Sequence, residues 1–568
     1  MTRVSDADIP ESIAFVHDSM SALVYNIAVV PVLTCALTFT AGWKDKMPSF
    51  TSVVGLFLSV ASLCVGLPTP SASQTCEDLF KIFPNNVAYS PLDLAHWSPA
   101  SFNFIDSVKH YWNAGHGQLI PACVFYPTNA IDVSRAVEVL NRYPTVKWAA
   151  KSGGHNANKD WSSVDGGVLI SFRPYMQDTT YNLDGTASVR PGARWSEAVA
   201  ALEPYSVTVV GGRIGDVGVG GYTLGGGLSF LSSQYGLACD MVVEFEVVLP
   251  DGTIATINDS ENTDLFFALK GGGNQFAIVT SFKMKTVPIG QVWGGIKIYT
   301  GDKASAIIDA THEFAADYSD VKAAIMPTFE TLLWGLTEVF VVFHFYDGRD
   351  VLTGVFDRFD AIDALIDLTK TQSYSNLLAG NNAANIYGFN YLIRAQTLPL
   401  LAGDDGRQLL QYQYNSFNDY AQQTQPQNLD LMVFSFAMQP LPVEIQNASL
   451  SSGAQNTFAF DVADGNRMWM EYDVAWVNPL SEGNAYQYAN HFTEDIVQYA
   501  QKTYPGAVST HQTNQADQYS PLFLNDVMFD QPTSSFYRPD VYQRLVQIQK
   551  SRDPDGFFSK RTGGAKFT

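Results

Sequence analysis

Charged side chains are scarce in this chain of 568 residues, because they make up only 16% of the sequence. Typical soluble proteins have about 25%. The cations are fewer than the anions: 34 Lys and Arg stand against 56 Asp and Glu, which gives a formal net charge of −22. Nucleic acids and anionic membranes bind to clustered Lys and Arg. The composition therefore argues against both partners and fits a soluble protein with a neutral or cationic substrate.

Cysteine is also rare, with five in the chain: Cys35, Cys64, Cys76, Cys123 and Cys239. The last three show no CxxC and no metal-ligand spacing, so the sequence predicts no metal site. In an exported protein, Cys76 and Cys123 can form a disulfide that ties the start of the mature chain to its first domain. Cys239 is expected to be a buried thiol. The alternative is three free, buried thiols.

Two common nucleotide-binding fingerprints are missing. No GxGxxG segment opens a helix after a strand, and no GxxxxGK segment ends in Ser or Thr. Their absence weakens the case for a Rossmann or P-loop domain. No internal repeat or low-complexity segment stands out either.

Two apolar runs lie near the amino terminus, over residues 23–43 and 53–65. The second run has the length of a signal-peptide core and is followed by the small residues of LPTPSASQ. It is short for a membrane span, which needs about 20 residues. We expect a secretory signal that begins near Met47 and is cleaved between about Gly66 and Ser73.

The leader predicted in this way covers residues 1–72, with 1–46 as an upstream extension and 47–72 as the signal peptide. A secreted or extracellular protein follows from it, and the sequons at Asn258 and Asn447 are compatible with a glycoprotein. The alternative is a membrane anchor formed by residues 23–43. Retention of those residues in the mature protein would favour the anchor.

Glycine is dense in one place, where nine of the seventeen residues from Gly211 to Gly227 are glycine. About sixty residues upstream lies the segment KSGGHN, which ends in His155-Asn156. Glycine permits positive φ and lets main-chain N–H groups approach a phosphate closely. The two segments together predict a backbone that wraps a phosphate-bearing cofactor, with His155 at the cofactor's ring.

Hydrophobic periodicity divides the mature chain into three parts: residues 73–290, 291–505 and 506–568. Strand and helix signals alternate over 121–288, whereas long strands with flanking helices over 291–505 predict an antiparallel sheet that carries helices on one face. Helices are expected at 130–140 (capped by Thr128 or Asn129), 195–202, 299–318, 355–370 and 540–550. Strands are expected at 146–150, 168–172, 187–190, 206–210, 241–249, 254–257, 331–346, 431–437 and 467–477.

His155 follows two glycines, so its backbone can bring the ring close to a planar cofactor. An imidazole nitrogen is nucleophilic enough to form a covalent bond to an activated methyl group. The alternative is a loop histidine that makes a hydrogen bond to a nearby carbonyl. Spacing alone does not decide between the two.

A series of motifs occurs in a recognisable order: CVFYPTNAIDVSRAVEVL, VKWAAKSGGHN, GGVLISF, VRPGARWSEAVAAL, VGVGGYTLGGGLSFLSSQYGLACD, DLFFALKGGGNQFAIVTSF and the late GNRMWMEYDVAW. The series resembles the FAD-binding domain of the vanillyl-alcohol-oxidase superfamily, and is most similar to fungal secreted members of its berberine-bridge-enzyme-like branch. The resemblance covers about residues 76–566. It implies an α+β, two-domain fold: a PCMH-type FAD-binding domain at about 117–288, a substrate domain, and a carboxyl-terminal segment that returns to the first domain.

The resemblance also implies roles for individual residues. His155 matches the histidine that is joined covalently to the flavin, and Ile214 stands where many relatives have a second, cysteinyl tether, so a single tether is expected. Val217 matches a gate residue whose small size accompanies oxidases and O₂, although ordinary packing is the alternative. Further positions match residues that line FAD: Ser152, Gly153, Gly154, Asn156, Gly215, Gly218, Gly220, Gly221, Val279 and Asn525.

A catalytic base is expected on the strand at 467–477, where alternation puts Trp469, Glu471 and Asp473 on one face. The resemblance favours Glu471, with Asp473 and Tyr472 as alternatives, and a solvated strand face remains possible. Relatives often have tyrosines near Asn525, but this chain has Phe523 and Asp526 there. A tyrosinate base at that place is therefore excluded.

The expected function is that of an FAD-dependent oxidase. It would remove a hydride and a proton from a small organic substrate, reduce O₂ to H₂O₂ and act in fungal secondary metabolism. One alternative is a secreted carbohydrate oxidase. Another is a ligand-binding or cyclase-like flavoprotein in which the flavin is structural.

Overall fold

The computed structural model describes residues 69–568 except 91–92, 319, 333–334, 454 and 506–520. The chain divides into two units, Met1–Gly66 and Leu67–Thr568, and every described residue belongs to the second. The predicted signal peptide up to residue 68 and the alternative anchor at 23–43 lie outside the described residues. Among the helices that the structure describes, none combines the length and apolar character needed to cross a membrane.

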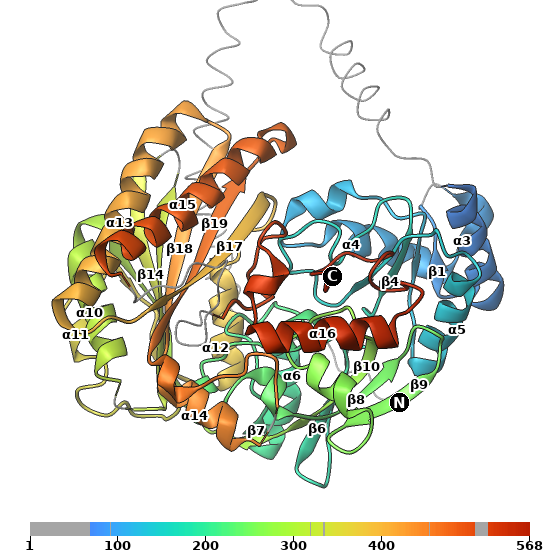
Figure 1. Cartoon of the computed structure of the whole chain (residues 1–568), viewed down its shortest axis with the longest axis horizontal. Coiled ribbons are helices and arrows are strands. Elements are labelled where there is room, and N and C mark those ends of the chain that lie inside the picture. The colour runs from blue at the N-terminus through green and yellow to red at the C-terminus, as the bar shows by residue number, and fades with distance from the viewer. Residues whose placement is uncertain (1–68, 91–92, 319, 333–334, 454, 506–520) are drawn as a thin grey trace, which may run out of the picture. The chain divides into compact units, whose positions relative to one another are not determined.

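Residues 73–290, for which the sequence predicts cofactor binding, are called the cofactor-binding region below. Its first layer is a small sheet with the strand order β1-β2-β4-β3, in which β2, β4 and β3 run parallel. These strands are β1 (Val87–Ala88), β2 (Cys123–Phe125), β3 (Trp148–Lys151) and β4 (Val168–Ser171). Helices α3 (Pro70–Ile82), α4 (Phe104–Lys109) and α5 (Ala130–Asn141) accompany them. Helices α3 and α5 lie beside these strands (Figure 1). The apolar residues of the two helices form one buried core with the strands.

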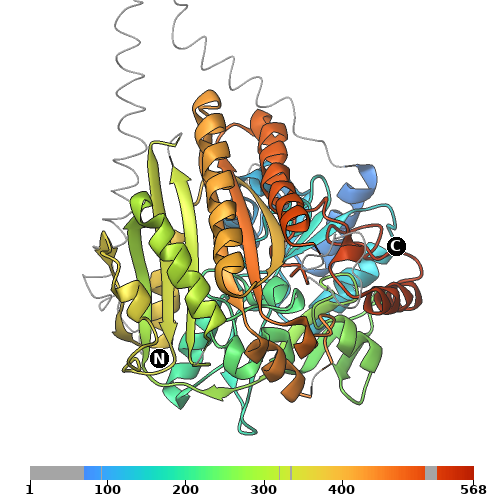
Figure 2. The ribbon, with the colours of Figure 1, turned by 60° about the vertical axis from the view of Figure 1, so that its left-hand side comes forward.

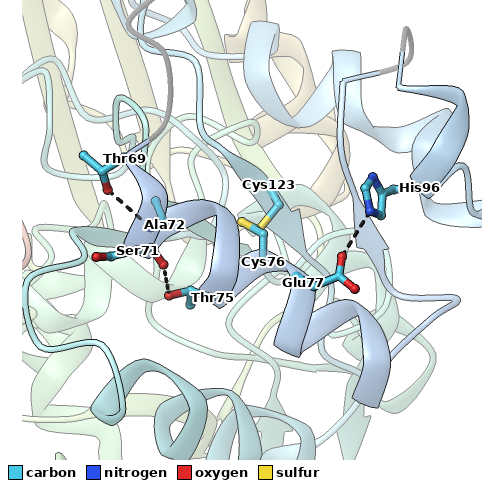
Figure 3. The surroundings of a disulfide bond; sticks show 8 residues. All are labelled: Thr69, Ser71, Ala72, Thr75, Cys76, Glu77, His96 and Cys123. Carbon is cyan, nitrogen blue, oxygen red and sulfur yellow. Dashed lines mark hydrogen bonds and ion pairs between the residues drawn. A yellow bond between two sulfur atoms is a disulfide. The ribbon is translucent and has the colours of Figure 1, made fainter.

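Three local predictions are confirmed. The side chain of Asn129 accepts a hydrogen bond from the backbone N–H of Asp132, so it caps α5 and satisfies a free helix donor. Cys76 on α3 and Cys123 on β2 form a disulfide (Figure 3). Cys239 is a free, buried thiol as expected.

The second layer is an antiparallel sheet of five strands in the order β5-β6-β10-β8-β9. The strands are β5 (Thr179–Tyr181), β6 (Thr186–Val189), β8 (Val242–Val248), β9 (Ile254–Asn258) and β10 (Ile278–Lys285). A further pair joins β7 (Val207–Thr208) to β11 (Val287–Pro288). The strands predicted at 241–249 and 254–257 are β8 and β9, which pair as a hairpin with Gly252 in the left-handed region at φ 89°. Helices α6 (Trp195–Leu202), α7 (Val219–Leu224), α8 (Ser232–Tyr235) and α9 (Thr263–Ala268) complete this region.

The third layer is an eight-stranded antiparallel sheet in the order β15-β12-β14-β13-β18-β19-β17, with β16 paired to β12. Its strands are β12 (Val292–Thr300), β13 (Ala323–Leu332), β14 (Thr337–Tyr346), β15 (Ile366–Asp367), β16 (Lys370–Gln372), β17 (Asn390–Pro399), β18 (Leu431–Leu441) and β19 (Arg467–Trp476). Helices α10 (Ala304–Ala316), α13 (Gly403–Thr424) and α15 (Glu482–Thr503) pack on one face (Figure 2). The antiparallel sheet with helices on one face agrees with the prediction.

The opposite face of this sheet packs against the cofactor-binding region. The ring of Phe345 on β14, for example, stacks on that of Phe230 with centroids 5.2 Å apart. Helices α12 (Tyr374–Asn381) and α14 (Val443–Ser451) lie at the junction, where α12 contacts α6 and α14 contacts α8. The sheet therefore faces helices on one side and the glycine segments on the other.

Two predicted elements of the sheet region are wrong. The expected helix at 355–370 is only α11 (Asp357–Asp360), because the chain beyond it gives its hydrogen bonds to the edge of β12 as β15 and β16. The expected single strand at 331–346 is instead the end of β13, a turn with Gly335 at φ 79°, and β14. The apolar run of the two strands hides the turn, and tertiary pairing overrides the helical spacing.

The carboxyl-terminal segment lies against the cofactor-binding region. Arg552, at the end of α16 (Pro539–Arg552), forms an ion pair with Asp264 on α9 at 2.7 Å. The guanidinium of Arg561 donates to the carbonyls of Val146 and Leu140 at 2.9 and 3.0 Å. The chain end is thus built into the first layer rather than trailing from the sheet (Figure 1).

Candidate active site

A cavity of about 330 Å³ lies between the glycine segments and the large sheet. Of the residues that the resemblance assigns to FAD, these line it: Ser152, Gly153, Gly154, His155, Asn156, Gly218, Gly220, Gly221, Val279 and Asn525. Val217 and Ile214 line it as well. Gly215 does not, because its N–H donates to the carbonyl of Leu378 and it packs against Ser196.

The two glycine segments cross in direct contact. A Cβ on Gly218 would lie 2.2 Å from the backbone nitrogen of Gly153, and a Cβ on Gly153 would lie 2.5 Å from that of Gly218. The hydroxyl of Ser152 accepts a hydrogen bond from the N–H of Gly220 at 3.1 Å, which fastens the crossing. A Cβ on Gly221, by contrast, would meet no atom within 4 Å. The crossing therefore presents bare backbone to the cavity.

The ring of His155 belongs to an aromatic stack on the cavity wall. The ring of Trp112 lies 4.9 Å from it at an interplanar angle of 16°, and the ring of Tyr391 lies 3.9 Å from Trp112 at 17°. Trp112 and His155 come from the cofactor-binding region, whereas Tyr391 comes from β17 of the sheet. The stack holds the imidazole plane in a fixed orientation.

The electrostatics of His155 favour a neutral ring. Burial and, secondly, the charge of Arg194 lower the pKa of His155 to about 3. Its Nδ1 is buried and has no hydrogen-bond partner among the described residues. A neutral imidazole with a free Nδ1 at a cavity wall is the form that acts as a nucleophile.

The large sheet contributes carboxyl groups in two neighbouring rows. In the pairing of β13, β18 and β19, Glu330 lies opposite Ser435 and Ser435 opposite Asp473, while Ala437 lies opposite Glu471. All of these side chains line the cavity, because residues two apart on a strand share a face. Asp526, from the carboxyl-terminal segment, lines it too.

Burial makes these carboxyls poor acids. It raises the pKa of Glu330 to about 7, raises that of Glu471, and holds those of Asp473 and Asp526 well above the usual range. The positive charge of Arg213 opposes the shift at Glu471 and Asp526. Proton exchange near neutral pH is therefore possible in this cluster.

Tyr472, an alternative base in the sequence analysis, does not reach the cavity. It occupies the other face of β19, where its ring lies among Phe417, Phe436 and Phe492 under the helices. Period-two alternation explains the difference, since Glu471 and Asp473 on either side of it point the other way. Trp469 shares the face of Glu471, but its ring packs edge-on against Phe523.

Asn525 connects the carboxyl-terminal segment to the glycine tract. Its side-chain nitrogen donates to the carbonyl of Tyr222 at 3.1 Å, and its oxygen accepts from the N–H of Gly227 at 3.3 Å. Asn525 therefore holds the backbone of the glycine tract as well as lining the cavity. The two crossed glycine segments, residues 151–156 and 211–227, are called the cradle below.

Sequence reasoning missed four residues of this wall: Trp112, Tyr391, Glu330 and Arg213. The strand β13 turns every second residue towards the cavity: Met326, Thr328 and Glu330. This alternation would have indicated a strand face that lines a cavity. That signal was lost because the predicted strand began only at residue 331. Among the described residues, no group of three or more His, Cys, Asp or Glu is placed to hold a metal ion.

Comparison with known proteins agrees with this geometry. The sequence model of the FAD binding domain matches residues 121–258. An uncharacterized FAD-linked oxidoreductase of Arthroderma benhamiae is 34% identical over 479 residues, which cover 82% of this chain and 91% of the relative. The chain belongs to the FAD-linked oxidoreductase family. A second relative of this oxidoreductase, the bifunctional solanapyrone synthase of Alternaria solani, is 29% identical over 78% of this chain and 81% of its own length.

Solved structures share the fold of this oxidoreductase. The 6-hydroxy-D-nicotine oxidase of Arthrobacter nicotinovorans superposes with a TM-score of 0.65 at 18% identity, covering 84% of this chain and 97% of that one. The carbohydrate oxidase of Microdochium nivale also gives a TM-score of 0.65 at 18% identity, with coverages of 87% and 100%. Identities this low establish the common architecture alone.

The residues present fit an FAD. The crossing of Gly153 and Gly218 leaves backbone where a side chain would block a dinucleotide, and Gly221 opens directly onto the cavity. His155 offers an unpartnered Nδ1 on the same wall. These features are consistent with the FAD-binding domain that the family brings.

Proposed function

We propose that this oxidoreductase is an oxidase of small organic molecules whose flavin is joined covalently to His155 and whose electron acceptor is O₂. One observation carries the proposal: a neutral, stacked imidazole with a free Nδ1 lines the same cavity as the carboxyl of Glu471. The nucleophile for flavin attachment, His155, and the proton acceptor, Glu471, therefore line one cavity.

The residues of the sheet supply the proton chemistry. Bound FAD supplies a two-electron acceptor for the oxidation of the substrate. Glu471 takes the proton that leaves an O–H or N–H of the substrate, because its carboxyl lines the cavity and burial has made it more basic. The nearby charge of Arg213 opposes this rise in the pKa of Glu471 and so favours its ionised form. Asp473, two residues along β19, is the second candidate.

Val217 supports O₂ as the acceptor. Its side chain lines the cavity beside the glycine crossing, and a small aliphatic side chain leaves room for a diatomic molecule there. H₂O₂ is then the product. The fungal relatives, among them a solanapyrone synthase, favour a substrate from secondary metabolism.

Sugar oxidation, the alternative function, has less support in the residues of the site. The glucooligosaccharide oxidase of Acremonium strictum has a 6-S-cysteinyl, 8α-N1-histidyl FAD. Ile214 lines the cavity where the second tether is expected, and it has no sulfur. A single tether through His155 is the arrangement that this chain permits.

We also propose that the protein is exported. The disulfide between Cys76 and Cys123 suits an oxidising compartment. Of the two sequons, Asn447 is exposed on α14, whereas the side chain of Asn258 is held by its own turn, so a glycan is expected at Asn447. Thr69 caps α3, and we expect signal cleavage to leave this residue in place. Sequencing the amino terminus of the mature protein tests this, since retention of residue 1 contradicts a cleaved secretory signal.

The tether is tested by acid precipitation of the purified protein. Wild-type protein should carry its yellow colour into the pellet, and His155→Ala should leave flavin in the supernatant. His96→Ala serves as the control, because His96 pairs with Glu77 and does not line the cavity. Flavin that stays with the His155→Ala pellet would disprove the covalent attachment at this residue.

The base is tested by single-turnover reduction of the flavin under anaerobic conditions. Glu471→Gln should slow reduction by about 100-fold or more, because the amide cannot accept the proton. Peroxide formation on sugars, phenolic alcohols and amines identifies the substrate for this assay. Reduction at the wild-type rate would show that Glu471 is not the base.

A further inference from the structure

Two carboxyl groups of the cavity lie in one row across the large sheet. Glu330 on β13 and Asp473 on β19 are each register partners of Ser435 on β18, and all three side chains line the cavity. Neighbouring strands are about 4.8 Å apart, so the Cα atoms of the two acids are separated by roughly 10 Å. At that separation, the carboxyl groups of Glu330 and Asp473 can both contact one small group placed between them.

The two acids have few partners within the protein. The carboxyl of Glu330 makes no hydrogen bond or ion pair with any described residue. Asp473 accepts one hydrogen bond through Oδ2 from the hydroxyl of Ser435 at 3.0 Å. Its Oδ1 is buried against the cavity and has no partner in the described part of the chain. The pair therefore leaves most of its acceptor capacity unused.

The positive charge in the cavity lies elsewhere. Arg213 is the one Lys or Arg among the described residues that line it, and its Nη1 is held by Met326 at 3.1 Å and by Gln439. Its charge acts on Glu471 and Asp526. After burial, the charged groups that raise the pKa of Asp473 are all carboxyls: Glu471, then Asp526 and Glu330. The hydrogen bond from Ser435 lowers this pKa, but Ser435 carries no charge. The Glu330–Asp473 row thus has no cation of its own.

An uncompensated pair of buried carboxyls is costly for a protein to ionise, whereas a ligand that brings a positive charge removes the cost. We propose that the substrate of this site carries a basic nitrogen, bound as an ammonium group between Glu330 and Asp473. The proposal rests on the proposed function for the identity of the cavity as the substrate site. It adds the chemical class of the substrate and the two residues that select it.

Recognition and proton removal are then separate tasks. Glu471 lies two residues from Asp473 on the same face of β19, a distance of about 6.6 Å along the strand. The ammonium group is held at Glu330 and Asp473, and the group that loses its proton lies towards Glu471. Glu330 and Asp473 are specificity residues in this scheme and do not replace the base.

Isothermal titration calorimetry with matched probes tests the proposal without relying on turnover. The probes are benzylamine, benzyltrimethylammonium and benzyl alcohol, titrated at pH 8 into the purified holoprotein. Both cations should bind about 10-fold or more tightly than the alcohol, as expected for a hydrogen-bonded or desolvated charge pair. The permanently charged probe shows whether charge suffices without an N–H donor.

Isosteric variants locate the effect. Glu330→Gln and Asp473→Asn should each reduce the preference for the cations, and the double variant should abolish it. Glu338→Gln, on the same sheet but outside the cavity, should keep the wild-type preference. Alcohol bound as tightly as the cations, cations that do not bind, or a preference that survives in the double variant would each overturn the proposal.

The outcome is separable from that of the proposed function. A protein without acid-stable flavin would refute the tether, yet the titration would still report on the two acids. A protein with acid-stable flavin and no cation preference would retain the oxidase proposal and refute the basic nitrogen.

Discussion

His155 differs from the other buried histidines of the described chain in what its nitrogens contact. His116 pairs with the hydroxyl of Ser163, His312 with the carbonyl of Leu401, and His344 with that of Val342. Each of those rings also keeps its second nitrogen unpartnered, but none of the three lines the cavity. His155 presents its free Nδ1 on the cavity wall and is held there by ring stacking, which fixes the plane of the ring without occupying a nitrogen.

The stack leads to a prediction for Trp112. Trp112→Leu should lower the fraction of protein whose flavin survives acid precipitation, because the imidazole loses the surface that orients it. Non-covalent flavin content should fall less. Trp97→Leu, at a side chain that is 52% exposed, is the control. An unchanged covalent fraction in Trp112→Leu would show that the stack is dispensable for attachment.

Glu330 leads to a prediction about pH. Its pKa of about 7 in the folded protein exceeds the ordinary value of 4.5, so the folded state binds the proton more tightly than the unfolded state. The contribution of Glu330 to the free energy of unfolding is therefore constant below pH 4.5, falls as the pH rises from 4.5 to 7, and then levels off. The loss is at most about 3 kcal/mol.

Glu330→Gln should remove this loss. Its melting temperature should match that of the wild type near pH 4.5 and exceed it above pH 7, as measured by thermal unfolding across that range. Burial also raises the pKa values of Asp473, Glu471 and Asp526 in the same cavity, so part of the wild-type pH dependence will persist. A constant difference at every pH would show that Glu330 is not the group responsible.

At the scale of elements, the cradle depends on the crossing of two glycine segments rather than on either alone. Gly218→Ala would put a Cβ 2.2 Å from the backbone nitrogen of Gly153, which the crossing cannot accommodate without moving apart. We expect a loss of about 1–3 kcal/mol in the free energy of unfolding, together with loss of flavin. Thermal unfolding and the flavin-to-protein absorbance ratio measure the two effects.

Gly221→Ala is the matched variant. Its Cβ would meet no protein atom, so the melting temperature should stay within error of the wild type or rise slightly. Flavin content should nevertheless fall, because the methyl group enters the cavity. Normal flavin content in Gly221→Ala would mean that the cofactor does not approach this part of the backbone.

Elements with their own local signals were predictable from sequence, and elements defined by pairing were not. Helix α6 has the predicted bounds, and the predicted strands over 146–150 and 168–172 fall on β3 and β4. The predicted helix at 355–370 failed because the edge of β12 captures that backbone. Helical spacing in a sequence cannot report an available strand edge.

The same distinction holds within the site. His155 and the glycines lie in two short motifs, so their place on the cavity wall could be anticipated. Trp112, Tyr391 and Glu330 come from three distant segments that only sheet register and packing bring together. No local pattern in the sequence records that assembly.

At the scale of the whole molecule, a disulfide bond and a set of hydrogen bonds attach the two ends of the described chain to the first layer. The disulfide between Cys76 and Cys123 joins α3 to β2 across 47 residues. Arg561 and its neighbours fasten the carboxyl-terminal segment to the same layer through hydrogen bonds. Both devices act on the region that forms the cradle.

Removal of the disulfide should destabilise this region. The double variant Cys76→Ser, Cys123→Ser should lose about 2–4 kcal/mol in the free energy of unfolding, because the unfolded chain gains the freedom of an open loop. Thermal unfolding with and without dithiothreitol checks this: the reductant should lower the melting temperature of the wild type and leave the variant unchanged. Insensitivity of the wild type to the reductant would argue against the bond in solution.

The return of the chain end also has a consequence for biosynthesis. Phe558, Thr562 and Ala565 line the cavity, and the backbone N–H of Trp148 on β3 donates to the carbonyl of Arg561. The wall of the cavity is thus incomplete until these three residues have been synthesised. We therefore expect flavin capture to follow their synthesis rather than to guide the folding of residues 73–290 during translation.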